Sequence, residues 1–188
     1  MENSQNRIWT IGHSNHSLEE FIQLLMTYKI STLVDIRSLP GSRKFPHFNK
    51  EELSVSLPRH GIKYIHLLSL GGRRKVDPHS VNIGWRHPAF RGYADYMQTA
   101  EFKEGIEELK RIASTERTAY MCSEAVWWSC HRSLVSDYLK LQGWEVLHIM
   151  SNTKVVEHPY TKPARIINGQ LNYTEPEQVN QSDSNGRK

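Results

Sequence analysis

Short apolar runs that alternate with helical patterns are the feature that most restricts how this 188-residue chain can fold. The run from Thr32 to Ile36 is continuous and rich in β-branched residues, which is typical of a strand buried on both faces of a parallel sheet. Similar runs with helical spacing between them predict an α/β fold, with a mostly parallel sheet of about five strands and helices on both faces. The expected strands cover residues 7–11, 32–36, 63–67, 118–121 and 144–149, and the expected helices cover 18–26, 49–57, 93–112 and 134–141.

Local signals add detail to this fold. Ser17 and Glu20 form a capping box in front of the first helix. Residues 76–90 contain Pro, Gly, His and Trp without any period, and they predict a long loop. The helix that follows this loop is expected to break near Thr99.

The C-terminal part of the chain has two further signals. Asn168 and Gly169, at the centre of residues 166–173, predict a hairpin. The last residues are polar and lack an apolar anchor, so they predict a disordered tail. We therefore expect a single domain over residues 7–176 and a tail over residues 177–188.

Composition excludes several classes of protein. Hydrophobic residues make up 38% of the chain, and no apolar run approaches the length of a membrane span. Residues 1–7 are polar, so we expect no secretory signal. The two cysteines, Cys122 and Cys130, favour free thiols in a reducing compartment. These observations predict a cytoplasmic protein without a membrane partner, and they leave the oligomeric state open.

The distribution of charge is more informative than the net charge of +4. Acidic residues concentrate on the expected helix faces, whereas basic residues fall in loops or at the ends of elements. Because right-handed crossovers place the ends of parallel strands at one edge of a sheet, these basic loops are expected to converge there. An anionic small molecule or a nucleic acid is therefore the expected partner. The basic residues concerned are Arg37, Arg43, Lys44, Arg73, Arg74, Lys75, Arg86, Arg91 and Arg132.

The densest group of reactive side chains lies in residues 120–134. This stretch holds both cysteines, Glu124, two adjacent tryptophans and a Cys-His-Arg tripeptide. It follows an expected strand and precedes an expected helix, which is where open α/β sheets place their sites. If the helix begins within residues 126–129, its dipole and the adjacent cationic side chains would lower the pKa of Cys130. The resulting thiolate suits a nucleophile or a metal ligand, and the alternative is an inert cysteine packed under the helix.

Four residues near Cys130 in the sequence leave alternatives open. Cys122 ends a central strand, where cysteine takes part in chemistry or packs as a small hydrophobe. Glu124 suits a general base or a cap for the next helix. Of Trp127 and Trp128, one is expected in the core, and the other offers a flat surface for stacking on a nucleobase.

The ends of the first two strands carry further polar candidates. Asp35 and Arg37 alternate along one strand end and share a side, which suits a structural ion pair or substrate binding by Arg37. His13 and Ser14 are adjacent, so they cannot easily form a Ser-His catalytic device. We interpret Ser14 as a phosphate-binding or capping hydroxyl.

Several motifs together resemble a known family. They are Thr10-Ile11-Gly12-His13-Ser14-Asn15, Val34-Asp35-Ile36-Arg37 with Pro40 and Ser42, Leu70-Gly71-Gly72, Cys122-x-Glu124, Cys130-His131-Arg132, His148-Ile149, His158-Pro159 and Thr161. In this combination the chain is similar to the domain of unknown function 488 family over about residues 7 to 176. The resemblance implies a compact α/β fold and a site at these motifs, and it implies no particular reaction.

We interpret the chain as an enzyme, a cysteine-dependent hydrolase or transferase that acts on an anionic nucleobase- or phosphate-containing substrate. One alternative is a non-catalytic nucleic-acid or nucleotide-binding module, and a second is a metal-dependent enzyme with Cys and His ligands. The suitable ligand types are Cys122, Cys130, His131, His148 and His158, but their spacing matches no zinc signature, so no metal ligand is assigned and the cofactor is left open. The candidate catalytic residues are Cys130, Glu124, Cys122 and His131, and the candidate substrate-binding residues are His13, Ser14, Asp35, Arg37, Arg73, Trp128, Arg132 and His158.

Overall fold

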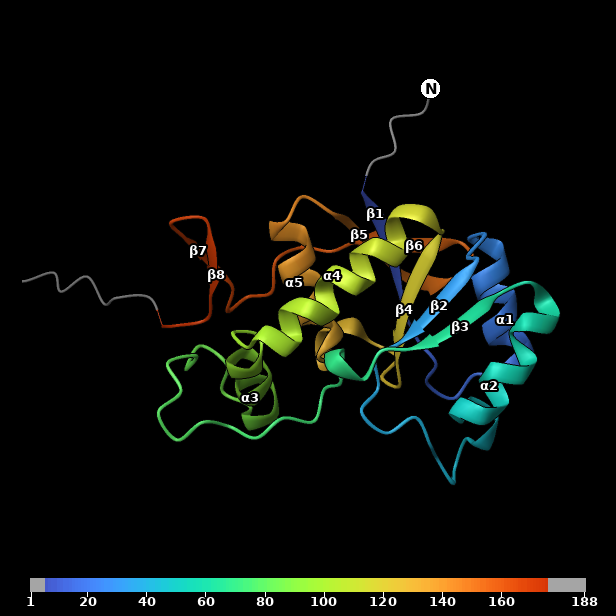
Figure 1. Ribbon diagram of the computed structural model, residues 1–188, viewed down its shortest axis with the longest axis horizontal. Helices are drawn as coiled ribbons and strands as arrows, with labels where there is room; N and C mark the ends of the chain where they lie inside the picture. Colours follow the sequence, from blue (N-terminus) through green and yellow to red (C-terminus); the bar gives the residue numbers. More distant parts are fainter. Residues whose placement is uncertain (1–5, 176–188) are drawn as a thin grey trace, which may run out of the picture.

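Six strands form one central sheet in the computed structural model, which describes residues 6–175 (Figure 1). The strands are β1 (Arg7–Gly12), β2 (Thr32–Asp35), β3 (Lys63–His66), β4 (Thr118–Cys122), β5 (Glu145–Ser151) and β6 (Lys154–Glu157). Their order across the sheet is β3-β2-β4-β1-β5-β6. The first five strands pair in parallel, and β6 is antiparallel to β5. The expected α/β fold with a mostly parallel sheet is confirmed.

Helices cover both faces of the sheet, as expected (Figure 1). α1 (Leu18–Thr27) and α2 (Lys50–Ser56) pack on one face, while α3 (Pro88–Tyr96), α4 (Ala100–Thr115) and α5 (Arg132–Leu141) pack on the other. Successive residues of β2 point to opposite faces, so Leu33 joins the first core and Val34 joins the second. Short 3-10 helices fill four connections: η1 (Pro46–Phe48), η2 (Pro58–His60), η3 (Leu68–Leu70) and η4 (Trp127–Ser129).

The helix boundaries follow from local capping. Ser17 makes the expected capping box with Glu20 at the start of α1. The long loop ends earlier than expected, because α3 already begins at Pro88. His87 is the N-cap of this helix, and its side chain accepts a hydrogen bond from the N–H of Ala89. Thr99 caps α4 and separates it from α3, so the expected break is present.

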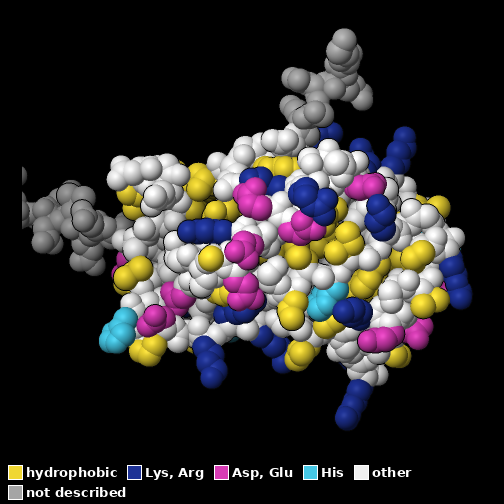
Figure 2. All heavy atoms as spheres, viewed as in Figure 1, with side chains coloured by type: hydrophobic (Ala, Val, Ile, Leu, Met, Phe, Trp, Pro, Cys, Tyr) yellow, Lys and Arg dark blue, Asp and Glu magenta, His cyan; other side chains and the backbone are white. Residues whose placement is uncertain are grey.

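Charges on the outward face of α4 are largely paired with one another. Glu107 lies 2.8 Å from Lys110, and Glu108 lies 2.7 Å from Arg111. Figure 2 shows acidic and basic side chains interspersed on this side of the molecule. Pairs at this spacing and exposure contribute little stability, and they leave no strong single-sign field on the helix.

The C-terminal segments differ in how well their sequence predicts them. β6 was missed, because this edge strand has only two apolar residues and depends on pairing with β5. The hairpin of β7 (Arg165–Ile167) and β8 (Gln170–Asn172) is confirmed, with Asn168 and Gly169 at φ 52° and 74°. The expected tail lies outside the described residues. Within residues 6–175, no helix combines the length and the apolar character that crossing a membrane requires.

Candidate active site

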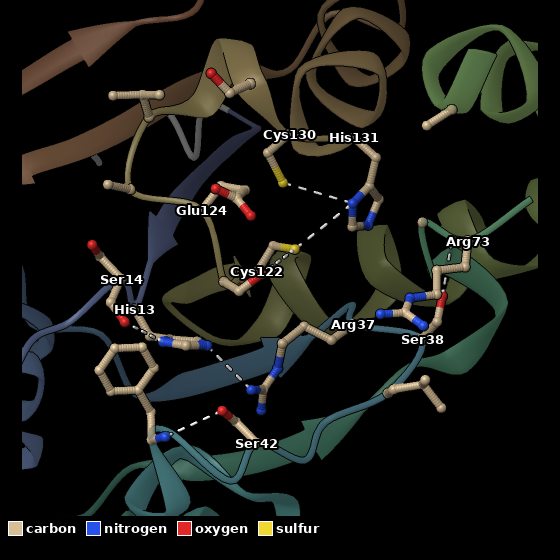
Figure 3. A pocket seen from close by; sticks show the side chains of 18 of the residues that line it. His13, Ser14, Arg37, Ser38, Ser42, Arg73, Cys122, Glu124, Cys130 and His131 are labelled. Atoms are coloured by element: carbon tan, nitrogen blue, oxygen red, sulfur yellow. Dashed lines mark hydrogen bonds between the residues drawn. The ribbon is translucent and has the colours of Figure 1, made fainter. Parts of the chain in front are cut away.

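A pocket of about 820 Å³ opens at the carboxyl-terminal edge of the sheet (Figure 3). The strand order places β2, β4 and β1 side by side, so the loops that follow them meet at this edge. The lining comes from residues within 13–15, 37–45, 72–73, 87–90 and 122–131. The site therefore lies where the topology predicts it, and all four candidate catalytic residues line it. Of the candidate substrate-binding residues, His13, Ser14, Arg37 and Arg73 line it, whereas Asp35, Trp128, Arg132 and His158 do not.

Cys122, Cys130 and His131 form a compact cluster in the wall of this pocket. His131 Nδ1 lies 3.7 Å from Cys122 Sγ and 3.6 Å from Cys130 Sγ. The other ring nitrogen, Nε2, lies 3.1 Å from the carbonyl oxygen of Ile36. Because a carbonyl oxygen only accepts hydrogen bonds, Nε2 carries the proton in the neutral ring, and the lone pair of Nδ1 faces both sulfur atoms.

The backbone before α5 brings these three side chains together. The expected helix start within residues 126–129 is wrong: a 3-10 turn occupies that segment, Cys130 is extended, and α5 begins at Arg132. The N–H of Arg132 lies 3.5 Å from Cys130 Sγ and donates to it, so the helix start still acts on this sulfur. Gly72 leaves room for the imidazole, because a Cβ there would lie 2.4 Å from His131 Nδ1.

The two thiols differ in acidity. Burial raises the pKa of Cys130, but the hydrogen bond from Cys122, the charge of Arg132 and the Arg132 N–H lower it to about 7. The hydrogen bond with Cys130 and burial raise the pKa of Cys122 to about 12. The pair therefore loses its first proton at Cys130.

Arg132 is buried behind the pocket and does not line it, which corrects its expected role as a substrate ligand. Its Nη1 donates to Thr10 Oγ1 at 3.0 Å, and its Nη2 donates to the carbonyl oxygen of Glu124 at 2.6 Å. No carboxylate of residues 6–175 lies within ion-pair distance of Arg132, so its charge acts on the neighbouring Cys130. It is a positioning residue.

Arg37 lines the pocket, whereas Asp35 lies behind it. Arg37 Nη2 lies 2.6 Å from Asp35 Oδ2, and the same oxygen accepts from the Tyr64 hydroxyl at 2.6 Å. Arg37 Nη2 also donates to the carbonyl oxygen of Phe48, and Nη1 lies 3.3 Å from His13 Nε2. Among the described residues, one N–H of Nη1 has no protein partner. Arg37 is thus mostly used in the fold and offers one donor to a ligand.

His13 is held as a neutral ring. Its Nδ1 donates to the carbonyl oxygen of Ser14 at 2.9 Å, which leaves Nε2 free to accept from Arg37. Burial, and next the charge of Arg37, lower the pKa of His13 to about 4. Both His13 and Ser14 line the pocket, but the Ser14 hydroxyl donates to Asn15 and not to the histidine ring.

Glu124 is exposed and lines the pocket. It does not cap α5, because His131 occupies the N-cap position and no side chain makes a cap hydrogen bond there. No hydrogen bond to its carboxylate is present among residues 6–175. Its backbone is held tightly, since Arg132 binds its carbonyl oxygen and a Cβ on Gly12 would approach that oxygen to 1.8 Å. The carboxylate is therefore free to act on a ligand from a fixed backbone position.

Neither tryptophan lies in the core, which corrects the expectation that one of them would, and neither ring reaches the pocket. Trp127 stacks on His148 with ring centroids 4.5 Å apart, while Trp128 is 54% exposed on the outside. The aromatic rings that do line the pocket are Phe45 and Phe90.

Sequence reasoning overlooked several lining residues. Besides the two phenylalanines, they include Ser38. Ser42 was named only as part of a family motif, and Lys44 only as one of many loop cations. The signal that marks them is position, because residues 38–45 follow a central strand at the edge where the site forms. Of the basic loop residues, only Arg37, Lys44 and Arg73 line the pocket.

His158 belongs to a separate buried network and not to the pocket. Its Nδ1 lies 2.9 Å from His148 Nε2, and its Nε2 lies 2.9 Å from Asp137 Oδ1. His148 Nδ1 in turn lies 2.8 Å from Thr10 Oγ1, which also binds Arg132. This chain of hydrogen bonds ties α5 to β1 and β5, and it holds Arg132 in place.

Lowering the pH is expected to destabilise the protein through His148. Burial, and then the charges of His158 and Arg132, lower the pKa of His148 to about 2, whereas an unfolded histidine has a pKa of about 6.5. Below pH about 6.5 the unfolded chain binds a proton at this ring that the folded chain does not. The free energy of unfolding should then fall by about 1.4 kcal/mol per pH unit from this group.

Urea unfolding between pH about 4.5 and 7 measures this slope for the protein and for His148→Gln. In His148→Gln, the slope of the free energy of unfolding against pH should be smaller by about 1.4 kcal/mol per pH unit, the contribution of one proton. His60→Gln removes an exposed histidine and should keep the slope of the unmodified protein. Identical slopes for all three proteins would show that His148 binds its proton in the folded state.

Comparison with known protein families identifies a family for this chain. A family model described as Domain of unknown function DUF488 matches residues 17–139, which is more than half of the chain. The matched segment includes Cys122, Glu124 and the Cys130-His131-Arg132 tripeptide. No curated protein and no solved structure matches the chain.

Proposed function

The chain belongs to the Domain of unknown function DUF488 family, and since that description names no reaction, we propose a function from the site itself. The pocket is the active site of a hydrolase or transferase that acts on an anionic, phosphate-bearing substrate of nucleotide type. The reaction takes place at the cluster of Cys122, Cys130 and His131, with Glu124 as the proton-transfer group.

One observation carries this proposal: an acidified thiol lies beside an imidazole in the wall of a pocket whose other charges, apart from Glu124, are basic. Cys130 has its pKa lowered to about 7 and contacts His131, and a perturbed group in a cleft is typical of catalytic sites. Arg73 and Lys44 line the same pocket as exposed cations. Glu124 is the one carboxylate in the lining formed by residues 6–175.

The shape and lining favour a small substrate. A volume of about 820 Å³ lies within the range of about 300–1,000 Å³ that is usual for small-molecule sites. Basic and hydroxyl groups, including Arg73 and Ser42, suit a phosphate group, and the rings of Phe45 and Phe90 suit an apolar or heterocyclic part. Trp128, the residue that suggested a nucleic-acid module, lies outside the pocket, so we do not propose that function.

We place the enzyme in the cytoplasm as part of this proposal. Both cysteines are free, and the proposed chemistry depends on their thiol form. A reducing compartment maintains that form.

Arg73→Ala is expected to weaken the binding of adenosine monophosphate by about 10–150-fold. Its backbone N–H is anchored to Ser38 Oγ at 3.0 Å, and Figure 3 shows its guanidinium on the pocket side of this anchor. The loss corresponds to one charge-assisted contact worth about 1.5–3 kcal/mol. Isothermal titration calorimetry with adenosine monophosphate, and separately with inorganic phosphate, measures the effect.

Arg43→Ala is the matched control, because Arg43 is an exposed arginine of a neighbouring loop that does not line the pocket. It should leave both affinities within about twofold, since an exposed charge outside a site is worth less than about 0.5 kcal/mol. Equal losses for the two variants would mean that only the net charge matters, and the proposed phosphate site would be wrong.

A further inference from the structure

The geometry points to a metal site in the pocket: Cys122, Cys130 and His131 ligate one zinc ion and leave a fourth position open to substrate. The inference rests on the proposed function, because it names what the cysteine–histidine centre of that active site holds. It also decides between the two roles that the acidic thiolate suits, a nucleophile and a ligand.

The distances among the three donor atoms fit a tetrahedral ion. With Zn–S of about 2.3 Å and Zn–N of about 2.0–2.1 Å, a tetrahedral angle separates sulfur from nitrogen by about 3.6 Å. His131 Nδ1 lies 3.7 Å from Cys122 Sγ and 3.6 Å from Cys130 Sγ. All three donor atoms lie within 4.8 Å of one another, and no other His, Cys, Asp or Glu group in residues 6–175 meets that criterion.

The single lone pair of Nδ1 favours an ion over a hydrogen bond. A neutral imidazole nitrogen accepts one strong hydrogen bond, yet two sulfur atoms lie at nearly equal distances from it. A cation placed between the three atoms satisfies all of them together. Nε2 donates to the carbonyl oxygen of Ile36 at 3.1 Å, which is the outer contact that orients a metal-binding histidine and leaves the other nitrogen free.

The charges around the cluster also fit a metal ion. Two thiolates would balance the two positive charges of Zn²⁺, and thiolates with imidazole are the donor set that zinc prefers. The N–H of Arg132 donates to Cys130 Sγ, as an outer contact to a ligated thiolate. Arg132 adds one buried positive charge without a carboxylate partner among the described residues. The site would therefore attract an anion at the fourth position, either hydroxide or an oxyanion of the substrate.

The open fourth coordination position determines which reaction the zinc ion can support. Three protein ligands with one open position are typical of catalytic zinc, whereas structural sites use four. Cys122, Cys130 and His131 all line the pocket, and so does Glu124, which follows Cys122 by two residues. A water molecule on the ion would give a proton to the Glu124 carboxylate, leaving hydroxide on zinc and a neutral carboxylic acid. The hydroxide oxygen would then bond to the phosphorus atom of the substrate while the bond from phosphorus to the leaving oxygen breaks. Glu124 would return its proton to that leaving oxygen, so the net reaction is the addition of water and the enzyme is a hydrolase.

Metal titration of the reduced, chelator-treated full chain tests the inference. Zn²⁺ content after dialysis should reach one ion per chain, and Co²⁺ should give the intense absorption of a thiolate-to-cobalt charge-transfer band. Cys122→Ser and Cys130→Ser should each weaken Zn²⁺ binding by more than about 100-fold, beyond the cost of an altered outer contact. Each should also reduce the cobalt band.

Two further variants keep the test decisive if a cysteine variant does not fold, because both retain all three ligands. Gly72→Ala keeps every ligand but places a Cβ against the His131 ring, and it should weaken Zn²⁺ binding by about 10–100-fold. His60→Gln, at an exposed position, should leave binding unchanged. In the unmodified protein, Zn²⁺ should protect both cysteines from iodoacetamide.

A folded chain that gives no cobalt–thiolate band, or zinc binding that survives Cys130→Ser, would overturn the metal site and leave the thiolate as a nucleophile. The proposed function fails separately. The affinity of metal-free protein for adenosine monophosphate is compared with that of metal-free Arg73→Ala. This comparison tests the substrate pocket independently of the zinc ion. Zinc binding without nucleotide binding would retain the metal site and reject the substrate.

Discussion

Asp35→Asn is expected to lower the free energy of unfolding by about 3–5 kcal/mol, because it leaves a buried arginine without its counter-charge. Asp35 is fully buried and Arg37 is 6% exposed. Burial lowers the pKa of Arg37, and the hydrogen bonds and charge of Asp35 raise it above its ordinary value. The carboxylate also accepts from the Tyr64 hydroxyl, and an amide in its place would set an N–H group against one of these donors.

The expected loss of stability depends on the burial of the ion pair and not on the distance between its charged atoms. Glu108 and Arg111 lie 2.7 Å apart, close to the 2.6 Å between Asp35 and Arg37, but their side chains are 42% and 68% exposed. Glu108→Gln should therefore cost less than about 1 kcal/mol. Urea unfolding of both variants checks the difference. A cost for Asp35→Asn as small as that of the surface pair would contradict the buried role of this ion pair.

The edge of the sheet that carries the site could be predicted from the sequence, because it depends on local strand and helix patterns plus the handedness of crossovers. The Ser17 capping box and the Asn168-Gly169 turn were predicted for the same reason. Each of these signals involves residues close together in the chain.

The geometry of the site could not be predicted, because it depends on contacts between distant residues. His131 is oriented by the carbonyl oxygen of Ile36 and by the space above Gly72, and neither appears in the pattern around Cys130. The burial of Arg132 runs against the general exposure of arginine; it results from Thr10 and the backbone of Glu124.

Glu124→Gln is expected to lower turnover by about 10²–10⁴-fold, because amide nitrogen and oxygen cannot take the proton that a carboxylate takes. Nucleotide binding should be retained or become tighter, since the substitution removes the one carboxylate that residues 6–175 contribute to the lining of a basic pocket. A module that only binds anions has no use for this carboxylate. Turnover is measured on whichever member of a nucleoside phosphate panel the unmodified protein consumes.

The structure also predicts that Glu124→Gln will leave stability unchanged within about 0.5 kcal/mol. The side chain is exposed, it caps no helix, and its carboxylate has no hydrogen bond among residues 6–175. Glu104→Gln removes an exposed carboxylate of α4 outside the pocket, and it should keep both turnover and stability. Loss of turnover with an unchanged melting temperature and retained adenosine monophosphate binding would support proton transfer by Glu124. A Glu124→Gln protein that turns substrate over at the unmodified rate would rule out that role, whatever its stability.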